Sequence, residues 1–218
     1  MNCTIEMNAT KEHWENIFKT KSSDEVSWFQ PYPKTSIEFV DLFKLPLEAA
    51  ILDVGAGDSY FVDALIEKGY SNIHILDISE AAIEKVKIRL GEKAKMVKWI
   101  VADITDYKPD ISFDFWHDRA SFHFLTTKGA IEKYVSLAER SILPGGYLIL
   151  GTFSEEGPTH CSGLEVKQYN ELSIAHHFSR SFDRIKCIHE NHVTPFNTTQ
   201  HFLFCSFLKK NNPLDFIE

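Results

Sequence analysis

The stretch ILDVGAGDSYF, residues 51–61, carries the strongest structural signal in this chain of 218 residues. Its first residues are mostly apolar and predict a short buried β-strand, and a helical pattern follows Tyr60. We call the segment between them, GAGDS (residues 55–59), the glycine turn. In an α/β sheet, a strand, turn and helix in this order place the turn at the carboxyl end of the strand, where ligands bind. The glycine turn is therefore the first candidate for a binding site.

The glycine turn differs from a dinucleotide-binding loop at one position. The fingerprint G-x-G-x-x-G needs a small residue at its last position, whereas this chain has Tyr60 there. We therefore expect the turn to bind something other than a pyrophosphate.

The segments around the turn predict the rest of the fold. From Glu48 onward, short β-branched runs alternate with helical stretches, which is typical of a parallel sheet covered on both faces. Two final strands follow each other without a helix and must pair antiparallel. We expect an α/β, three-layer Rossmann-like fold with a seven-stranded, mostly parallel sheet and a C-terminal antiparallel hairpin. The predicted strands are 49–54, 72–78, 98–104, 113–118, 147–153, 182–193 and 198–210.

Three helices are expected between these strands. Residues 61–69 and 79–91 each stop at a glycine, and the second begins at Ser79, a good N-cap. Residues 130–143 form the third helix, which the segment PGG (144–146) should end.

Length and composition predict a single domain, because one hydrophobic core can serve a chain of this size. We divide it into an N-terminal helical and aromatic arm that could act as a lid (1–47), a Rossmann-like core (48–210) and a loosely held tail (211–218). The arm contains VSWFQPYPK (26–34), whose aromatic rings either only bury area or close over a ligand. Both interpretations stay open.

Charge and cysteine usage exclude several classes of protein. The net charge of −8, without a Lys/Arg stripe, argues against a nucleic-acid partner. The chain has no signal peptide or long apolar run, so we expect a cytoplasmic protein without a membrane partner. Cys3, Cys161, Cys187 and Cys205 form no CxxC pair, and we therefore expect no metal site and only reduced thiols.

Acidic residues end the first three predicted strands. Asp53 precedes the glycine turn, Asp77 ends the second strand and Asp103 ends the third. Asp77 is placed to accept hydrogen bonds from ribose hydroxyls. Three carboxylates around one crevice favour a cationic ligand that carries an amine and a sulfonium.

The set DVGAGDS (53–59), ILDIS (75–79) and VADI (101–104) resembles the motifs of class I methyltransferases. The resemblance extends from about residue 49 to residue 207 and implies S-adenosylmethionine as cofactor and S-adenosylhomocysteine as product. It implies that Asp53, Gly55, Ala56 and Gly57 line the methionine part, that Asp77 holds the ribose, and that Asp103 with Ile104 contacts adenine. The candidate cofactor-binding residues are Trp14, Trp28, Phe29, Asp53, Val54, Gly55, Ala56, Gly57, Asp77, Ile78, Ser79, Asp103, Ile104 and Asp118.

The acceptor site should lie beside the fourth predicted strand, where the sequence reads FDFWHDRASFHF (113–124). Methyl transfer from a sulfonium is a displacement in line, so the enzyme mainly aligns a nucleophile and excludes water. Asp118 or His117 could act as a general base, and Arg119 could orient an anionic acceptor. Alternatively, Asp118 and Arg119 form a structural ion pair while His123 only packs.

Two further loops, 151–169 and 191–202, should reach the same mouth. The chain resembles a bacterial branch of the family that carries WHDRA, GTF, GP, CSGL and TPFNTTQ in this order. Cys161 either binds a soft acceptor such as a metalloid or selenol, or is a small apolar packing residue. Together with His123, Cys161 and Tyr169 are the substrate-side candidates.

Three functions stay open. We favour a small-molecule methyltransferase that acts on a thiol, selenol, carboxylate or amine. The front segment HWENIFKTKSSDEVSWFQPY (13–32) resembles the opening of lysine methyltransferases that modify folded proteins, so a protein acceptor is the alternative. The NPPY-type tetrapeptide of DNA- and glutamine-modifying relatives is missing after the fourth strand. A non-catalytic binder of S-adenosylmethionine or a nucleotide is the third class, and the residues do not indicate the oligomeric state.

Overall fold

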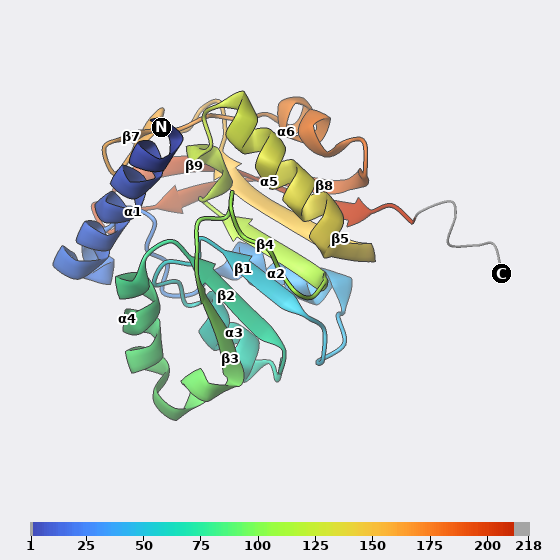
Figure 1. Ribbon diagram of the computed structural model, residues 1–218, viewed down its shortest axis with the longest axis horizontal. Coiled ribbons are helices and arrows are strands. Elements are labelled where there is room, and N and C mark those ends of the chain that lie inside the picture. Colours follow the sequence, from blue (N-terminus) through green and yellow to red (C-terminus); the bar gives the residue numbers. More distant parts are fainter. Residues whose placement is uncertain (1, 212–218) are drawn as a thin grey trace. The chain divides into compact units, whose positions relative to one another are not determined.

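The computed structural model describes the backbone of residues 2–211 and the side chains of residues 9–211 (Figure 1). Seven strands form one sheet in the order β3-β2-β1-β4-β5-β9-β8, and two short strands form a separate pair. This confirms the predicted α/β fold with a seven-stranded, mostly parallel sheet. The chain comprises two compact units, residues up to 107 with 193–198, and residues 108–192 with the chain from residue 199. All but the first residue of the predicted tail lies outside the described residues.

The first unit contains three parallel strands. Residues of β1 pair with β2, and those of β2 pair with β3. All residues of β1 and β2 are buried, which explains why their sequences are nearly continuous apolar runs without alternation. The unit comprises α1 (Asn2–Thr20), α2 (Lys34–Phe43), β1 (Ile51–Val54), α3 (Phe61–Glu67), β2 (Ile73–Asp77), α4 (Glu80–Leu90) and β3 (Val97–Val101), with short 3-10 helices at Ser23–Glu25 and Gly91–Met96.

The predicted start of helix α4 is confirmed. Ser79 is its N-cap, and the Ser79 hydroxyl accepts a hydrogen bond from the N–H of Ala82 at 3.2 Å. The cap fixes where the chain leaves β2 and turns into the helix.

The second unit contains the remaining strands of the sheet. β4 pairs parallel with β5, and β5 pairs antiparallel with β9. The unit comprises β4 (Phe113–Arg119), a 3-10 helix (Phe122–Phe124), α5 (Lys128–Ser141), β5 (Ile142–Phe153), β6 (His160–Cys161), β7 (Leu164–Glu165), α6 (Glu171–Phe178), β8 (Phe182–Val193) and β9 (Thr199–Lys209).

Two local details of the second unit differ from the prediction. Helix α5 ends at Ser141 and β5 begins at Ile142, so the PGG segment lies inside the strand, where pairing with β4 shifts register. Helix α6 was not predicted. It is only eight residues long and begins at a capping box of Asn170 and Ser173, a signal too short to stand out from a loop.

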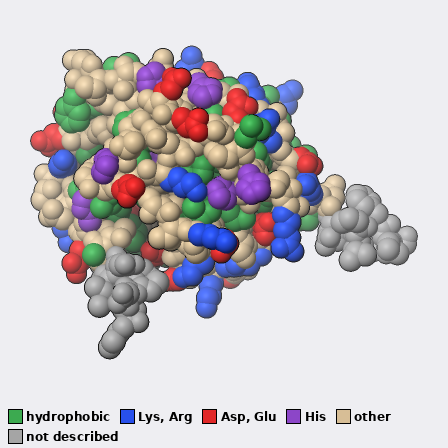
Figure 2. Space-filling view, turned by 90° about the horizontal axis from the view of Figure 1, so that it is seen from above, with side chains coloured by type: hydrophobic (Ala, Val, Ile, Leu, Met, Phe, Trp, Pro, Cys, Tyr) green, Lys and Arg blue, Asp and Glu red, His purple; other side chains and the backbone are tan. Residues whose placement is uncertain are grey.

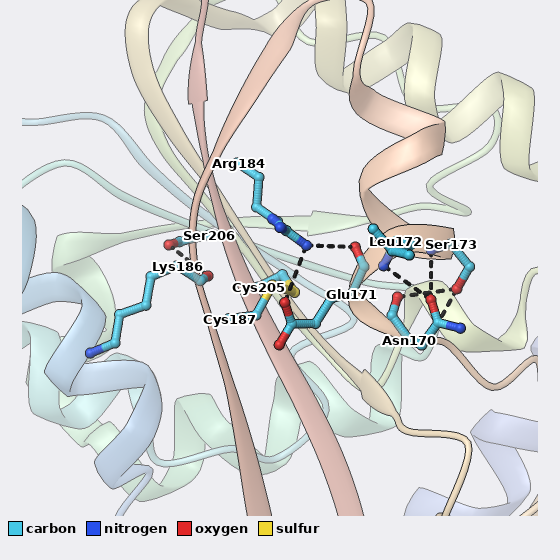
Figure 3. Close-up of a disulfide and its surroundings, with 9 residues drawn as sticks. All are labelled: Asn170, Glu171, Leu172, Ser173, Arg184, Lys186, Cys187, Cys205 and Ser206. Atoms are coloured by element: carbon cyan, nitrogen blue, oxygen red, sulfur yellow. Dashed lines mark hydrogen bonds and ion pairs between the residues drawn. A yellow bond between two sulfur atoms is a disulfide. The ribbon is translucent and has the colours of Figure 1, made fainter.

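Cys187 and Cys205 form a disulfide between β8 and β9 (Figure 3). The hydroxyl of Ser206 donates to the carbonyl of Lys186 at 3.2 Å, next to the Cys187–Cys205 pair. Residue numbers therefore rise along one strand as they fall along the other. The two strands therefore run antiparallel, as predicted. The expectation of reduced thiols throughout is wrong for this pair, because the strand register brings two cysteines together that are 18 residues apart. Cys161 is free and buried.

Within residues 2–211, none of the helices has the length and hydrophobicity that crossing a membrane requires.

Candidate cofactor and acceptor sites

The glycine turn has the backbone conformation that its sequence predicts. Gly55 and Gly57 have φ of 60° and 56°, in the left-handed region that favours glycine. The N–H of Ala56 donates to the carbonyl of Leu76 at 3.2 Å, which joins the turn to the end of β2. A Cβ atom at Gly57 would lie 3.0 Å from the Cζ atom of Phe18. A side chain at Gly57 would therefore be strained by the positive φ and would require Phe18 to shift by a few tenths of an ångström.

Asp77 lies at the end of β2, and its side chain is buried. One carboxylate oxygen accepts from the N–H of Gly57 at 2.7 Å, and the other accepts from the N–H of Ser79 at 2.8 Å. Burial raises the pKa of Asp77 to about 6, and the nearby charges of Asp53 and Asp58 act in the same direction, against the lowering by the two hydrogen bonds. Each oxygen has a second lone pair. Asp77 therefore fixes the turn and keeps the capacity to accept from a ligand hydroxyl.

The other strand-end residues have different surroundings. Asp53 and Asp58 are both buried near Asp77. Asp103 is half-buried, and its carboxylate accepts from the N–H and the hydroxyl of Thr105 at 2.7 and 2.8 Å, which closes a local turn. Ile104 beside it is buried. The structure therefore clusters two predicted acids with Asp58, which sequence reasoning missed, and Asp103 holds its own loop.

The N-terminal arm contacts the start of α4 through Glu15. Its carboxylate accepts from the hydroxyl of Ser79 at 2.7 Å and from the N–H of Ala81 at 3.2 Å, and pairs with Lys19 at 3.0 Å. Burial alone raises the pKa of this carboxyl, but the hydrogen bonds from Ser79, Lys19 and Ala81 outweigh it and lower the pKa to about 2. Glu15 gave no signal in the sequence.

Aromatic rings of the arm lie against the glycine turn. The ring centroids of Trp14 and Trp28 are 5.7 Å apart, and Phe18, which contacts Gly57, lies 6.2 Å from Trp28. The ring of Phe29 lies 6.1 Å from that of Tyr60 at the end of the turn. The predicted aromatic residues are thus gathered at the turn, together with Phe18, which was missed.

In the second unit, Asp118 stabilises the bend after β4. The carboxylate is fully buried, and one oxygen accepts from the N–H groups of Ser121 and Phe122, each at 3.0 Å. The other oxygen accepts from the hydroxyl of Tyr134 at 2.7 Å. These contacts flank Ala120, which has a left-handed φ of 67°. Burial raises the pKa of Asp118 to about 6 despite these hydrogen bonds.

His117, Arg119 and His123 lie at the carboxyl end of β4. Nδ1 of the buried His123 accepts from the N–H of Phe153 at 3.1 Å, which places the ring proton on Nε2. Burial, and then the charge of Arg119, lower the pKa of His123 to about 3, so the ring is neutral at pH 7. The guanidinium of Arg119 lies 5.3 Å from the ring centroid of Phe202. The carboxylate of Asp118 is held by the two backbone N–H groups and the Tyr134 hydroxyl described above.

The other two substrate-side candidates have separate surroundings. Tyr169 is buried with its ring 5.4 Å from that of Phe122. Burial and the charge of Asp118 raise the pKa of the Tyr169 hydroxyl. Cys161 is buried in the β6–β7 pair. Tyr169 therefore lies beside Phe122, which follows β4.

Comparison with known proteins gives the class. Residues 51–146 match the family described as a methyltransferase domain. The chain is 31% identical over 107 residues to malonyl-[acyl-carrier protein] O-methyltransferase 2 of Ilyobacter polytropus, covering 49% of this chain and 40% of that protein. It is 27% identical over 183 residues to human EEF1A lysine methyltransferase 2, covering 75% of this chain and 72% of that protein.

Solved structures share the fold. One, described as converting a disulfide bond into a thioacetal group during echinomycin biosynthesis, has a TM-score of 0.75 at 18% identity and covers 94% of this chain and 95% of that chain. A second is 1,6-didemethyltoxoflavin-N1-methyltransferase of Burkholderia thailandensis with bound S-adenosylhomocysteine, with a TM-score of 0.69, 16% identity and coverage of 96% and 89%.

These findings place a methyltransferase domain of the class I fold in this chain. The residues around the glycine turn fit S-adenosylmethionine, whose product S-adenosylhomocysteine is bound in the second of these solved structures. A Cβ at Gly57 would press on the ring of Phe18, and buried carboxylates that suit a cation lie beside the turn. The chain spans 40% and 72% of the lengths of the two curated relatives.

Proposed function

We propose that this chain transfers a methyl group from S-adenosylmethionine to a small-molecule acceptor. The observation that carries the proposal is the buried Asp77 carboxylate, which bridges the N–H groups of Gly57 and Ser79 beside Asp53 and Asp58. Three acids in a buried cluster repel one another, and a ligand with an amine and a sulfonium would relieve that repulsion.

The proposed cofactor contacts follow from this cluster. Asp77 accepts from the ribose hydroxyls, Asp53, Gly55, Ala56 and Gly57 line the methionine part, and Asp103 with Ile104 contacts adenine. Trp14, Trp28 and Phe29 wall the cleft, and Val54, Ile78 and Ser79 complete the binding site. The contact of Phe18 with Gly57 supports this arrangement, because it brings the aromatic arm onto the turn.

In the proposed reaction, the chain mainly aligns the acceptor and excludes water. S-adenosylmethionine supplies the electrophilic methyl group. Asp118 positions the bend after β4, since its oxygens are already held by three donors. His123 offers a neutral Nε2–H donor rather than a base. His117 and Arg119 are then the candidates for binding the acceptor, with Tyr169 nearby.

A small-molecule acceptor is supported by a solved neighbour of the same fold. Figure 2 shows acidic and basic side chains interspersed on one face, without a continuous stripe of one sign. The neighbour with bound 1,6-didemethyltoxoflavin shows that this fold can carry a small-molecule methyltransferase.

Two measurements test the proposal. Calorimetric titration with S-adenosylhomocysteine should show one site per chain. Purified protein incubated with S-adenosylmethionine and a panel of thiols, selenols, carboxylates and amines should release S-adenosylhomocysteine with at least one of them. Absence of binding would refute the cofactor site, and tight binding with no turnover across all acceptors would favour a non-catalytic binder.

A protein lysine acceptor is the second candidate. Of the two curated relatives, the one that matches this chain over more of its own length, 72% against 40%, is a lysine methyltransferase. Radiolabelled S-adenosylmethionine added with the protein to a lysate that lacks it should label a discrete protein band. An unlabelled lysate would remove this candidate.

A further inference from the structure

The side chain of Arg89, near the end of α4, binds the glycine turn. Its guanidinium donates to the carbonyl oxygens of Asp58 and Ser59 at 2.8 and 2.6 Å. It also pairs with both carboxylate oxygens of Asp63, at 2.7 and 3.2 Å. The guanidinium carbon lies 4.0 Å from the ring centroid of Tyr60. One side chain therefore holds two backbone carbonyls, a carboxylate and an aromatic face.

These contacts fix the direction of the peptide groups in the turn. In a trans peptide, the N–H of one residue points away from the carbonyl of the residue before it. Holding the carbonyls of Asp58 and Ser59 therefore directs the N–H groups of Ser59 and Tyr60 away from Arg89. The N–H of Ser59 donates to the carbonyl of Ala56 at 3.0 Å, which closes the turn around Gly57. Arg89 thus stabilises this closed turn through the two carbonyl oxygens.

Helix electrostatics do not explain why a cation lies here. Tyr60 is the N-cap of α3, and the N-terminus of a helix disfavours positive charge. Asp63 in the first turn of α3 neutralises the guanidinium. The position of Arg89 is therefore explained by its hydrogen bonds to the carbonyls of the turn.

We propose that Arg89 is a positioning residue that sets cofactor affinity by holding the carbonyls of Asp58 and Ser59. This inference rests on the proposed cofactor site. A lysine could keep the ion pair with Asp63, but its single ammonium cannot hold two carbonyls, a carboxylate and the Tyr60 face at once.

The test compares Arg89→Lys with Asp63→Asn, which keeps the guanidinium and its carbonyl contacts. Calorimetric titration with S-adenosylhomocysteine should show affinity about tenfold weaker for Arg89→Lys, the effect of losing a hydrogen bond or two. Asp63→Asn should stay within about threefold. Hydrogen exchange should be faster in Arg89→Lys at residues 57–60 and unchanged in β1 and β2.

Wild-type affinity in Arg89→Lys would overturn the inference, because a positive charge at this position would then suffice. Equal losses of stability in both variants with unchanged affinity would also overturn it, since that result describes a structural ion pair. If Arg89→Lys does not fold, Tyr60→Leu keeps the guanidinium and removes its stacking surface together with the ring contact to Phe29, and it should still weaken binding and speed exchange at residues 57–60. If the wild type itself does not bind S-adenosylhomocysteine, the proposed function is refuted.

Discussion

At the scale of single residues, the buried carboxylates have opposite consequences for ligand binding and for folding. Asp77 and Asp118 each have a pKa raised to about 6 by burial. The folded state therefore holds their protons more tightly than the unfolded chain does. The cost of burying them ionised is fully present above pH 6 and is relieved as the pH falls toward 3.8.

Cofactor affinity should depend on pH through Asp77. As the pH falls through about 6, its carboxylate gains a proton and loses acceptor capacity for ribose hydroxyls. We expect S-adenosylhomocysteine to bind several-fold more weakly at pH 5.5 than at pH 7.5, measured by calorimetry. Asp77→Asn should bind more weakly at both values and show a flat profile. A pH profile unchanged by this substitution would assign the dependence to another group.

The hydroxyl of Tyr134 links two buried polar groups. It donates to Asp118 at 2.7 Å and accepts from Nε1 of Trp116 at 3.0 Å. Tyr134→Phe leaves both partners without this hydrogen bond, so we expect the free energy of unfolding to fall by about 2–4 kcal/mol. Urea denaturation measures the loss. Tyr32→Phe is the control, since Tyr32 is exposed and should change stability by less than about 0.5 kcal/mol.

At the scale of elements, β8 is held to β9 by the disulfide as well as by pairing. Beyond it, Arg184 on β8 pairs with Glu171 of α6 at 3.2 Å (Figure 3). These contacts fix an edge strand whose residues are mostly exposed. An edge strand with little buried area depends on such cross-links for its order.

Reducing the disulfide should destabilise the wild type by about 2–4 kcal/mol, the range for cross-links of this loop length. Unfolding in urea with and without dithiothreitol gives this difference. Cys187→Ser should be less stable than the oxidised wild type and insensitive to reductant. Labelling every cysteine in the denatured, unreduced protein would show that the disulfide is absent.

The arm and α6 show where prediction of elements from sequence stopped. Strands 49–54 and 72–78 were recognisable because buried parallel strands are continuous apolar runs, whereas most residues of β3 are not buried. The α1 contact of Glu15 with Ser79 joins residues 64 positions apart, and no local pattern encodes it. The same applies to the ring of Phe18 over Gly57.

At the scale of the whole molecule, cofactor binding and stability should be linked. A ligand that binds only the folded state stabilises it by about 2.7 kcal/mol at a concentration 100 times Kd. Gly57→Ala should abolish most of this effect of S-adenosylhomocysteine, because a Cβ there meets Phe18 and the backbone φ is positive. Thermal unfolding with and without ligand measures it.

Gly129→Ala is the matched control for this prediction. A Cβ at Gly129 meets nothing within 4 Å, and the residue lies in the first turn of α5. Its stabilisation by ligand should equal that of the wild type. A Gly57→Ala variant that responds to ligand like Gly129→Ala would contradict the proposed role of the turn.

The sequence alone determined the fold class, the glycine turn and the acids Asp53 and Asp77, because these depend on hydrophobic pattern and on residues adjacent along the chain. The tertiary structure decided the disulfide, the hydrogen bonds of Arg89 to the turn and the hydrogen bond of Tyr134 to Asp118. Each of these joins residues far apart in sequence, and only strand register and helix packing set the distances between them.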